Sequence, residues 1–372
     1  MALFSCIYDL LTLLCLSSKC DEEKPACQKC ILREIDCSYP PLLPLVWKGG
    51  KTPCKESERR ATPLLDYGNG NSDEENAPSL NLDNLDLIIN WFTRTVHTVN
   101  SASNFAAIET CQTVILNQAM QHHFLLHGLL GLSALHLAET HLDPLKYTRI
   151  ATAHHTQGLN LFHSILKQVN EDNYAASIAF SSITAMFALG VARPEAGKLA
   201  RIEIVDDLAQ VFLLAKGWHK VVQVADGLKS REGDSIFPCP DSSGSPLSYD
   251  TEAAFKRIDT LNKGRDEGVY RLAISSLKSV FEKLGDEKSD DPHIALAWAA
   301  TLPEEFTRLI KDRQSLALAL LGYFCVVLDR VPQVWWLRGW SKGLFGVVWT
   351  HTACNHILEW PRDRIGFSEG SI

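Results

Sequence analysis

The sequence lacks an excess of positive charge. Its 36 Lys and Arg residues are outnumbered by 44 Asp and Glu residues, which gives a formal net charge of -8 over 372 residues. A chain of this charge has no global attraction to nucleic acid, so any contact with DNA has to come from a small local patch. The hydrophobic share of 46% and the charged share of 22% are close to globular averages, which excludes a chain that is disordered throughout.

Cysteine is scarce over most of the chain. Of the 11 cysteines, six lie within the first 37 residues and the other five are scattered. A secreted disulfide protein would be small or would carry cysteines throughout. A short terminal cluster before a long cysteine-poor region instead indicates a reducing compartment and metal binding. The six clustered cysteines are Cys6, Cys15, Cys20, Cys27, Cys30 and Cys37.

Membrane and export signals are also missing. Residues 1–18 are apolar, but they have no basic start and Asp9 interrupts them, so we do not expect a signal peptide. Elsewhere we expect no apolar run long enough to span a bilayer without a charge or a break.

Catalytic motifs are absent as well. No Gly-x-Ser-x-Gly elbow occurs, and the His123–His127 pair lacks the glutamate of a zinc protease because Phe124 stands in its place. Such histidines in an apolar helix are more often core or capped residues. Gly128 and Gly131 lie inside the same expected helix and therefore form no phosphate-binding loop. We do not expect an enzyme.

Apolar periodicity predicts an all-α fold from residue 81 onward. Asn81 or Asp83 could cap the first helix, whose apolar positions recur from Leu82 to Val96, and Asp143-Pro144 marks a later helix start. Residues 41–80, rich in Pro and Gly, are expected to be a disordered linker. We find no alternating strands, heptads or internal repeat. The remaining helices are expected at 123–141, 144–169, 174–190, 203–225, 250–285, 303–329 and 333–354.

The most specific motif lies in residues 19–40. Its cysteines have the spacing C-x6-C-x2-C-x6-C, from Cys20 through Cys27 and Cys30 to Cys37. Two cysteine thiolates with two residues between them can coordinate one metal ion from a tight turn. Zinc takes four such ligands in a tetrahedron. The segment therefore predicts a zinc site.

Residues 19–40, KCDEEKPACQKCILREIDCSYP, resemble the second half of the fungal zinc binuclear cluster, the C6 finger. In that family six cysteines hold two zinc ions and share two of the cysteines between them. The resemblance implies that Cys20 takes the third position, Cys27 the fourth and bridging position, Cys30 the fifth and Cys37 the sixth.

The first half of the family pattern is not present. The family would place cysteines at positions 10 and 13, where Leu10 and Leu13 stand, while Cys6 and Cys15 lie nearby at another spacing. The family reads DNA with a basic helix before its third cysteine, and here only Lys19 is basic in that stretch. Residues 19–37 carry four basic and five acidic side chains, so they offer few phosphate contacts.

Two explanations of this departure stay open. Either the cluster of a genuine regulator has degenerated, or residues 1–18 are an artefact of the gene model, which is the explanation we favour. Residues 10–18 are rich in Leu, Ser and Cys, the composition of a translated pyrimidine-rich intron end.

Most of residues 81–367 resemble the effector domain of fungal regulators of the sterol-uptake-control type. The resemblance is carried by five stretches, at 85–96, 122–138, 153–162, 334–340 and 358–361. It implies a helical regulatory domain that in some relatives binds a sterol, a nuclear location, and pairing into a homodimer. Four tryptophans could line an apolar cavity or pack in the core: Trp335, Trp336, Trp340 and Trp349.

The sequence thus predicts an incomplete zinc-cluster segment, a linker and a multi-helix effector domain at residues 81–372. The expected function is control of RNA polymerase II genes, sterol-related or for secondary metabolites, with zinc as cofactor and DNA as partner. The alternative is a ligand-sensing or protein-interaction regulator that has lost DNA binding.

Overall fold

The described part of the chain is built from helices and contains no strand, which confirms the predicted all-α fold. The computed structural model describes residues 81–100, 104–194, 202–215, 246–285, 289, 291–331, 334–352 and 355–368. The described residues from 87 onward belong to one compact unit. The predicted zinc-cluster segment and linker lie outside the described residues, and the domain boundaries stay a prediction.

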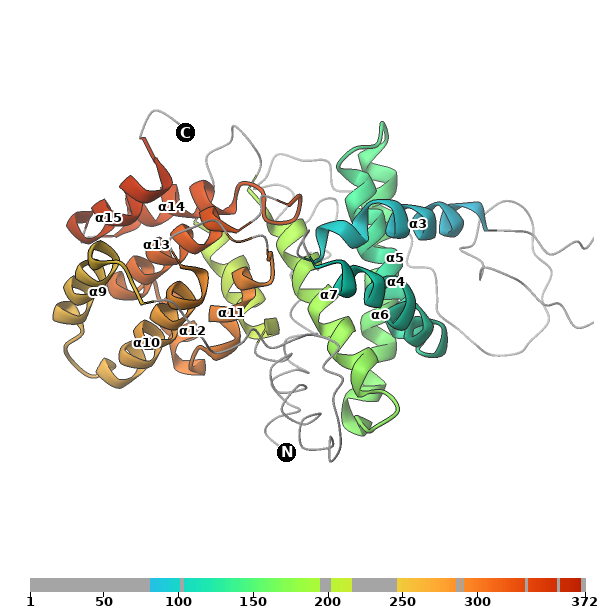
Figure 1. Ribbon diagram of the computed structural model, residues 1–372, viewed down its shortest axis with the longest axis horizontal. Helices are drawn as coiled ribbons and strands as arrows, with labels where there is room; N and C mark the ends of the chain where they lie inside the picture. The colour runs from blue at the N-terminus through green and yellow to red at the C-terminus, as the bar shows by residue number, and fades with distance from the viewer. Residues whose placement is uncertain are drawn as a thin grey trace, which may run out of the picture. The chain divides into compact units, whose positions relative to one another are not determined.

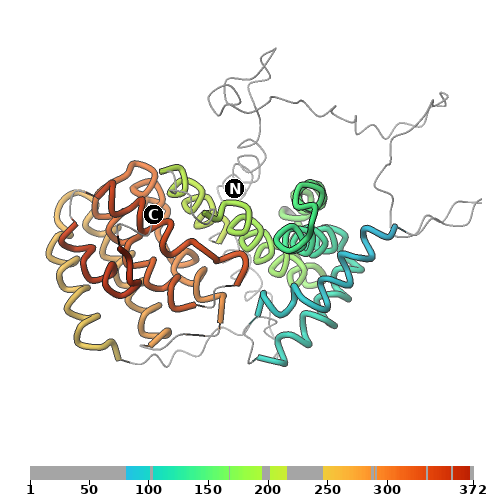
Figure 2. Tube along the Cα trace, turned by 90° about the horizontal axis from the view of Figure 1, so that it is seen from above, coloured from blue at the N-terminus to red at the C-terminus, as the bar shows by residue number. Residues whose placement is uncertain are grey.

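A first group of helices packs around α5, the predicted central helix (Figures 1 and 2). Helix α5 buries ten of its 16 residues because it is apolar on nearly all sides. Helices α4, α6 and α7 contact it. The elements of this group are α3 (Leu82–Thr93), η1 (Thr95–Thr98), α4 (Phe105–Gln121), α5 (His123–Ala138), α6 (Pro144–Ile165), η2 (Leu166–Gln168) and α7 (Tyr174–Ala192).

Two predicted helix starts are confirmed. The side-chain oxygen of Asn81 accepts a hydrogen bond from the Asn84 amide at 3.1 Å. Asp143 accepts one from the Lys146 amide at 3.0 Å, and Pro144 follows it in the first helical turn. In both cases a side chain satisfies an amide that the helix leaves without a partner.

A second group packs around α13 (Figure 1). Helix α13 is buried along almost its whole length, and α10, α14 and α15 contact it. The helices of this group are α9 (Tyr249–Leu261), α10 (Glu267–Leu284), α11 (Ile294–Thr301), α12 (Glu304–Lys311), α13 (Ser315–Arg330), α14 (Trp340–His351) and α15 (Asn355–Ile365).

A helix at residues 204–215 is tied to the turn between α12 and α13. Arg313 donates two hydrogen bonds to the carboxylate of Asp206, at 2.7 and 3.0 Å. Arg313 also has a φ of 54°, which lies in the left-handed backbone region that residues other than glycine rarely adopt. The ion pair and the turn therefore depend on the same residue.

Several sequence-based expectations need correction. The helix expected at 250–285 is broken between α9 and α10, where Gly264 has a φ of 115°. The one expected at 303–329 is broken at Arg313, and the one expected to begin at 333 begins at Trp340 after Gly339, whose φ is 85°. Helices α4 and α11 were not predicted. The helix expected at 203–225 is described only up to residue 215.

The apolar face predicted from Leu82 to Val96 is only partly buried, with Val96 at its end fully buried. Leu82 and Ile89, placed on that face by their spacing, are 64% and 53% exposed. The helix instead buries Leu87, Asn90 and Trp91. Asn90 is drawn inward because its amide donates to Ser133 on α5, at 3.0 Å to the hydroxyl and 3.1 Å to the carbonyl. The hydrogen bonds satisfy the amide that burial removes from water.

Candidate functional site

The predicted zinc ligands Cys20, Cys27, Cys30 and Cys37 lie outside the described residues, as do Lys19, Cys6 and Cys15. Four thiolates at this spacing match the donor set that one tetrahedral zinc ion requires. They are two short of the six that a binuclear cluster uses. Among the residues that the structure does describe, no group of three or more His, Cys, Asp or Glu side chains could hold a metal ion.

The two cysteines of the helical part that can be described, Cys111 and Cys325, are free and buried. Burial raises the pKa of both thiols, and the Asn100 side chain, which donates to Cys111, opposes this only in part. A raised pKa keeps a thiol protonated, and the thiol is neither a good nucleophile nor a metal ligand. Both cysteines therefore act as small apolar core residues.

The histidines of α5 and α6 pair across the two helices. Nδ1 of His127 lies 2.9 Å from Nδ1 of His154, so the hydrogen-bonding partner of His127 comes from α6 and not from its neighbour His123 on α5. Burial, and then the neighbouring His127, lowers the pKa of His154 to about 4. Burial and then His123 lower the pKa of His127. Both rings are therefore neutral near pH 7. The Nδ1–H of one ring donates a hydrogen bond to the unprotonated Nδ1 of the other.

His155 is a core histidine. Its ring stacks on Phe187 with centroids 3.9 Å apart and planes 3° from parallel. Its Nε2 atom is buried without a hydrogen-bond partner among the described residues. Burial lowers its pKa to about 3, which keeps the ring neutral. The interpretation of these histidines as core residues is thus confirmed at this position.

The tryptophans near residue 335 join the two helix groups. Trp335 donates its indole N–H to the Thr98 hydroxyl at 3.0 Å, and Trp336 donates to the Thr98 carbonyl at 3.0 Å. Trp340 donates to the carbonyl of Leu189 on α7, also at 3.0 Å. Thr98 was not singled out by the sequence, because a lone threonine in a short helix gives no periodic signal.

Further contacts fix Trp335. Its ring stacks on His136 with centroids 5.0 Å apart, and His136 accepts or donates a hydrogen bond with Thr95 at 3.0 Å. Burial, with smaller contributions from the positive charges of Arg94 and Arg338, lowers the pKa of His136 to about 4. Arg193 donates to the Trp335 carbonyl at 3.0 Å and pairs with Glu139. The residues that contact these tryptophans from the first group are Thr98, His136, Leu189 and Arg193.

These tryptophans are core packing rather than the walls of a described cavity. Trp335, Trp336 and Trp340 are at most 4% exposed. They line neither of the two hollows that the structure describes. Of the two open alternatives, packing is therefore the one that the geometry favours.

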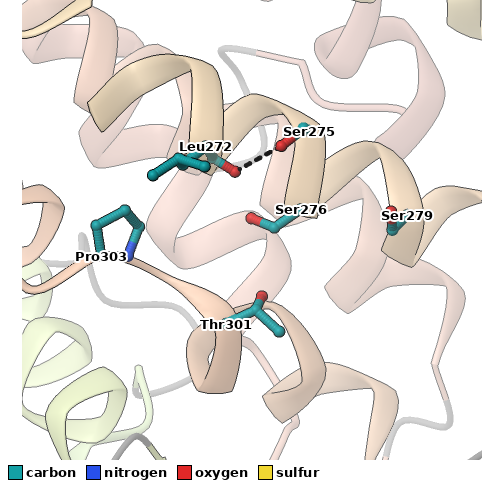
Figure 3. A pocket seen from close by; sticks show the side chains of 6 residues that line it. All are labelled: Leu272, Ser275, Ser276, Ser279, Thr301 and Pro303. Carbon is teal, nitrogen blue, oxygen red and sulfur yellow. Dashed lines mark hydrogen bonds between the residues drawn. The ribbon is translucent and has the colours of Figure 1, made fainter. Parts of the chain in front are cut away.

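The larger hollow is an open groove of about 340 Å³ between α10 and the connection from α11 to α12. Figure 3 shows that hydroxyl groups gather along it. Ser275 donates to the Leu272 carbonyl, and Thr301 to the Trp298 carbonyl. A sterol would need an enclosed apolar pocket, and this groove is open and partly polar. Its lining is Leu272, Ser275, Ser276, Ser279, Thr301 and Pro303.

Helix α7 corrects the expectation about apolar runs. Its 19 residues are long and apolar enough to cross a membrane by length and composition alone. Of its most apolar window, however, 78% is buried inside the protein, as in the core helix of a globular domain. Phe180 and Phe187 of this helix contact the ring of His155 on α6.

Comparison with known proteins identifies the cysteine segment. No curated protein shows significant similarity to this chain. Residues 17–44 match the fungal Zn(2)-Cys(6) binuclear cluster domain, a zinc-binding domain of DNA-binding transcription regulators rather than enzymes. The chain thus carries a match to a zinc-cluster domain at residues 17–44, a domain found in fungal transcription regulators, and the part of the chain after it that the structure describes is helical.

Proposed function

We propose that this chain is a nuclear transcription regulator whose cysteine segment binds zinc through Cys20, Cys27, Cys30 and Cys37. The observation that carries the proposal is the family match at residues 17–44, which encloses these four cysteines at the family's spacing. Zinc would supply the fold of a segment that is too short to bury a core of its own. The helical residues 81–372 would form the regulatory part.

The contact with DNA would rest on few side chains. Lys19, Lys24, Lys29 and Arg33 are the basic residues between position 19 and Cys37. Each can neutralise one phosphate, and five acidic side chains in the same stretch repel the backbone. We therefore expect weak DNA binding that falls steeply as salt is added.

The zinc proposal is tested by metal analysis of the purified full chain and of variants. Cys20→Ser, Cys27→Ser, Cys30→Ser and Cys37→Ser each remove one thiolate, and each is expected to reduce bound zinc from about one ion per chain to a small fraction. Cys54→Ser, outside the motif, is the control and should keep the zinc. Zinc content that no single variant changes would contradict the assignment, and two ions per chain would mean that Cys6 and Cys15 complete the cluster.

A second candidate is a ligand-sensing or protein-interaction regulator that has lost DNA recognition. It is favoured by the leucines at positions 10 and 13 and by the acidic balance of residues 19–37. Titration of the zinc-loaded chain with labelled DNA at 50 and 200 mM salt separates the two candidates. Salt-sensitive binding supports the DNA-binding regulator, whereas retained zinc without DNA binding supports the second candidate.

The proposal that this protein controls sterol or secondary-metabolite genes rests on the resemblance of most of residues 81–367 to sterol-uptake-control effector domains. The charge and packing of the described helices favour no one class of target gene over another. A sterol ligand would be tested by the change in melting temperature of the full chain on adding a water-soluble sterol. A rise that increases with concentration supports it, and no change speaks against a sterol.

A further inference from the structure

A small, partly enclosed cavity lies where four elements of the first helix group meet a segment of the second. Its volume is about 20 Å³. Trp91 on α3, Asn100 after η1, Cys111 on α4 and Ser182 on α7 contribute to its wall. His293, in the turn before α11, closes it from the second group. The cavity is therefore a shared boundary of the two groups.

One wall residue carries a hydrogen-bond donor that the fold leaves without an acceptor. The Trp91 side chain is buried, with 3% of the residue exposed, and its Nε1 atom has no partner among the described residues. A buried donor left unsatisfied carries its full desolvation penalty, so such a group favours a binding partner. The buried indoles of Trp298, Trp336 and Trp340, in contrast, all donate to carbonyl oxygens at 3.0 Å.

The size and polarity of the cavity restrict what can satisfy Trp91. A water molecule needs roughly 10–15 Å³ of such space and two to four polar partners. The Ser182 hydroxyl donates to the Ile178 carbonyl at 3.2 Å, which leaves its oxygen able to accept a further hydrogen bond. An acceptor larger than water, such as a sterol, does not fit into about 20 Å³.

We infer that this cavity is a binding site for one structural water molecule, which accepts the Trp91 indole N–H and donates to Ser182. The water replaces the acceptor that α3 lacks and lies against His293 of the second group. The water molecule is therefore part of the boundary between the two helix groups. Its hydrogen bonds to Trp91 and Ser182 hold it among residues that are otherwise mostly apolar. The inference does not depend on zinc or on DNA binding.

The test is magnetisation transfer from water to the tryptophan indole protons of the full chain, labelled with nitrogen-15 at its nine tryptophans. The Trp91 signal, assigned by its loss in Trp91→Phe, is expected to show rotating-frame cross-relaxation with water. That effect has the opposite sign to chemical exchange. The indole protons of Trp336 and Trp340, which donate to protein carbonyls, are the internal controls and should show none.

A second variant keeps the test decisive if Trp91→Phe does not fold. Ser182→Val replaces the accepting hydroxyl by methyl groups and fills part of the cavity. It is expected to abolish the water transfer at the one indole signal that showed it, while the other indole signals stay unchanged. A folded wild-type chain in which no indole proton shows a cross-relaxation with water that Ser182→Val removes would overturn the inference.

Discussion

At the scale of single residues, His155 couples the fold to pH. Its buried ring stays neutral in the folded state because burial lowers its pKa to about 3, whereas the histidine of an unfolded chain titrates near 6.5. Between these two values the unfolded state binds a proton that the folded state does not. Stability is therefore unaffected by this group above pH 6.5 and falls as the pH is lowered from 6.5 toward 3, by up to about 1.4 kcal/mol per pH unit.

The variant His155→Phe is expected to flatten this dependence. Phenylalanine keeps the stack on Phe187 and removes the buried Nε2 atom that has no partner in the described structure. We expect denaturant midpoints of the variant and the wild type to be similar at pH 7.5 and to separate at pH 5, with the variant more stable.

Urea titrations at both pH values measure the difference. His97→Gln, a change at an exposed histidine, is the control and should keep the wild-type slope. A His155→Phe slope equal to the wild type would mean that the ring is protonated in the folded state. Because the pKa values of His136 and His154 are also lowered, to about 4, part of the dependence remains in the variant.

At the scale of elements, the close packing of α5 against α6 depends on glycine. A Cβ atom on Gly158 would lie 3.0 Å from the Phe124 carbonyl oxygen and 2.9 Å from the Phe180 ring. A backbone oxygen cannot move aside as a flexible side chain can. Gly158→Ala is therefore expected to destabilise the fold by about 1–3 kcal/mol despite the better helix propensity of alanine.

The matched control is Gly268→Ala, near the start of α10, where an added Cβ meets no atom within 4 Å. This change should be neutral or stabilising by up to about 1 kcal/mol. Thermal unfolding of the two variants gives the comparison. Equal melting temperatures would show that α5 and α6 can separate at little cost.

The helices with strong apolar patterns were predictable, and the reason is visible in α5, α6 and α7. Helix α6 buries one apolar face, which gives a helical periodicity, whereas α5 and α7 are continuous apolar segments of 16 and 19 residues that are buried on nearly all sides. Helix α4 was missed because its buried face includes small residues such as Cys111 and Ala119, which contrast little with their neighbours. The breaks at Gly264 and Arg313 depend on backbone angles, which apolar spacing does not encode.

The candidate site was only partly predictable for a similar reason. Cysteine spacing is a local feature, so the zinc motif could be found from the sequence and matches the family. The partners of the tryptophans are distant in sequence: Trp335 and Thr98 are 237 residues apart. No local pattern of residues predicts such a pairing.

At the scale of the whole helical part, Trp335 should control how firmly the two helix groups hold together. Trp335→Ala removes the stack on His136 and the hydrogen bond to Thr98, and such truncations cost about 3–5 kcal/mol. Hydrogen exchange is expected to accelerate in η1 and in the last turn of α7 more than in α9 or α10.

Hydrogen exchange followed by mass spectrometry measures this difference. Trp349→Ala is the control, because Trp349 contacts Phe345 and Arg362 within the second group. It should leave exchange in η1 unchanged. Uniform acceleration in both groups after Trp335→Ala would mean that they unfold as one cooperative unit.

The turn at Arg313 limits how this protein can change over evolutionary time. Glycine or asparagine would suit a φ of 54° better, but neither could reach both oxygens of Asp206. Lysine would keep the positive charge but would lose the bidentate hydrogen bonding to the Asp206 carboxylate. No single substitution meets both demands, so a replacement that relieves the backbone at this turn gives up the ion pair to the 204–215 helix.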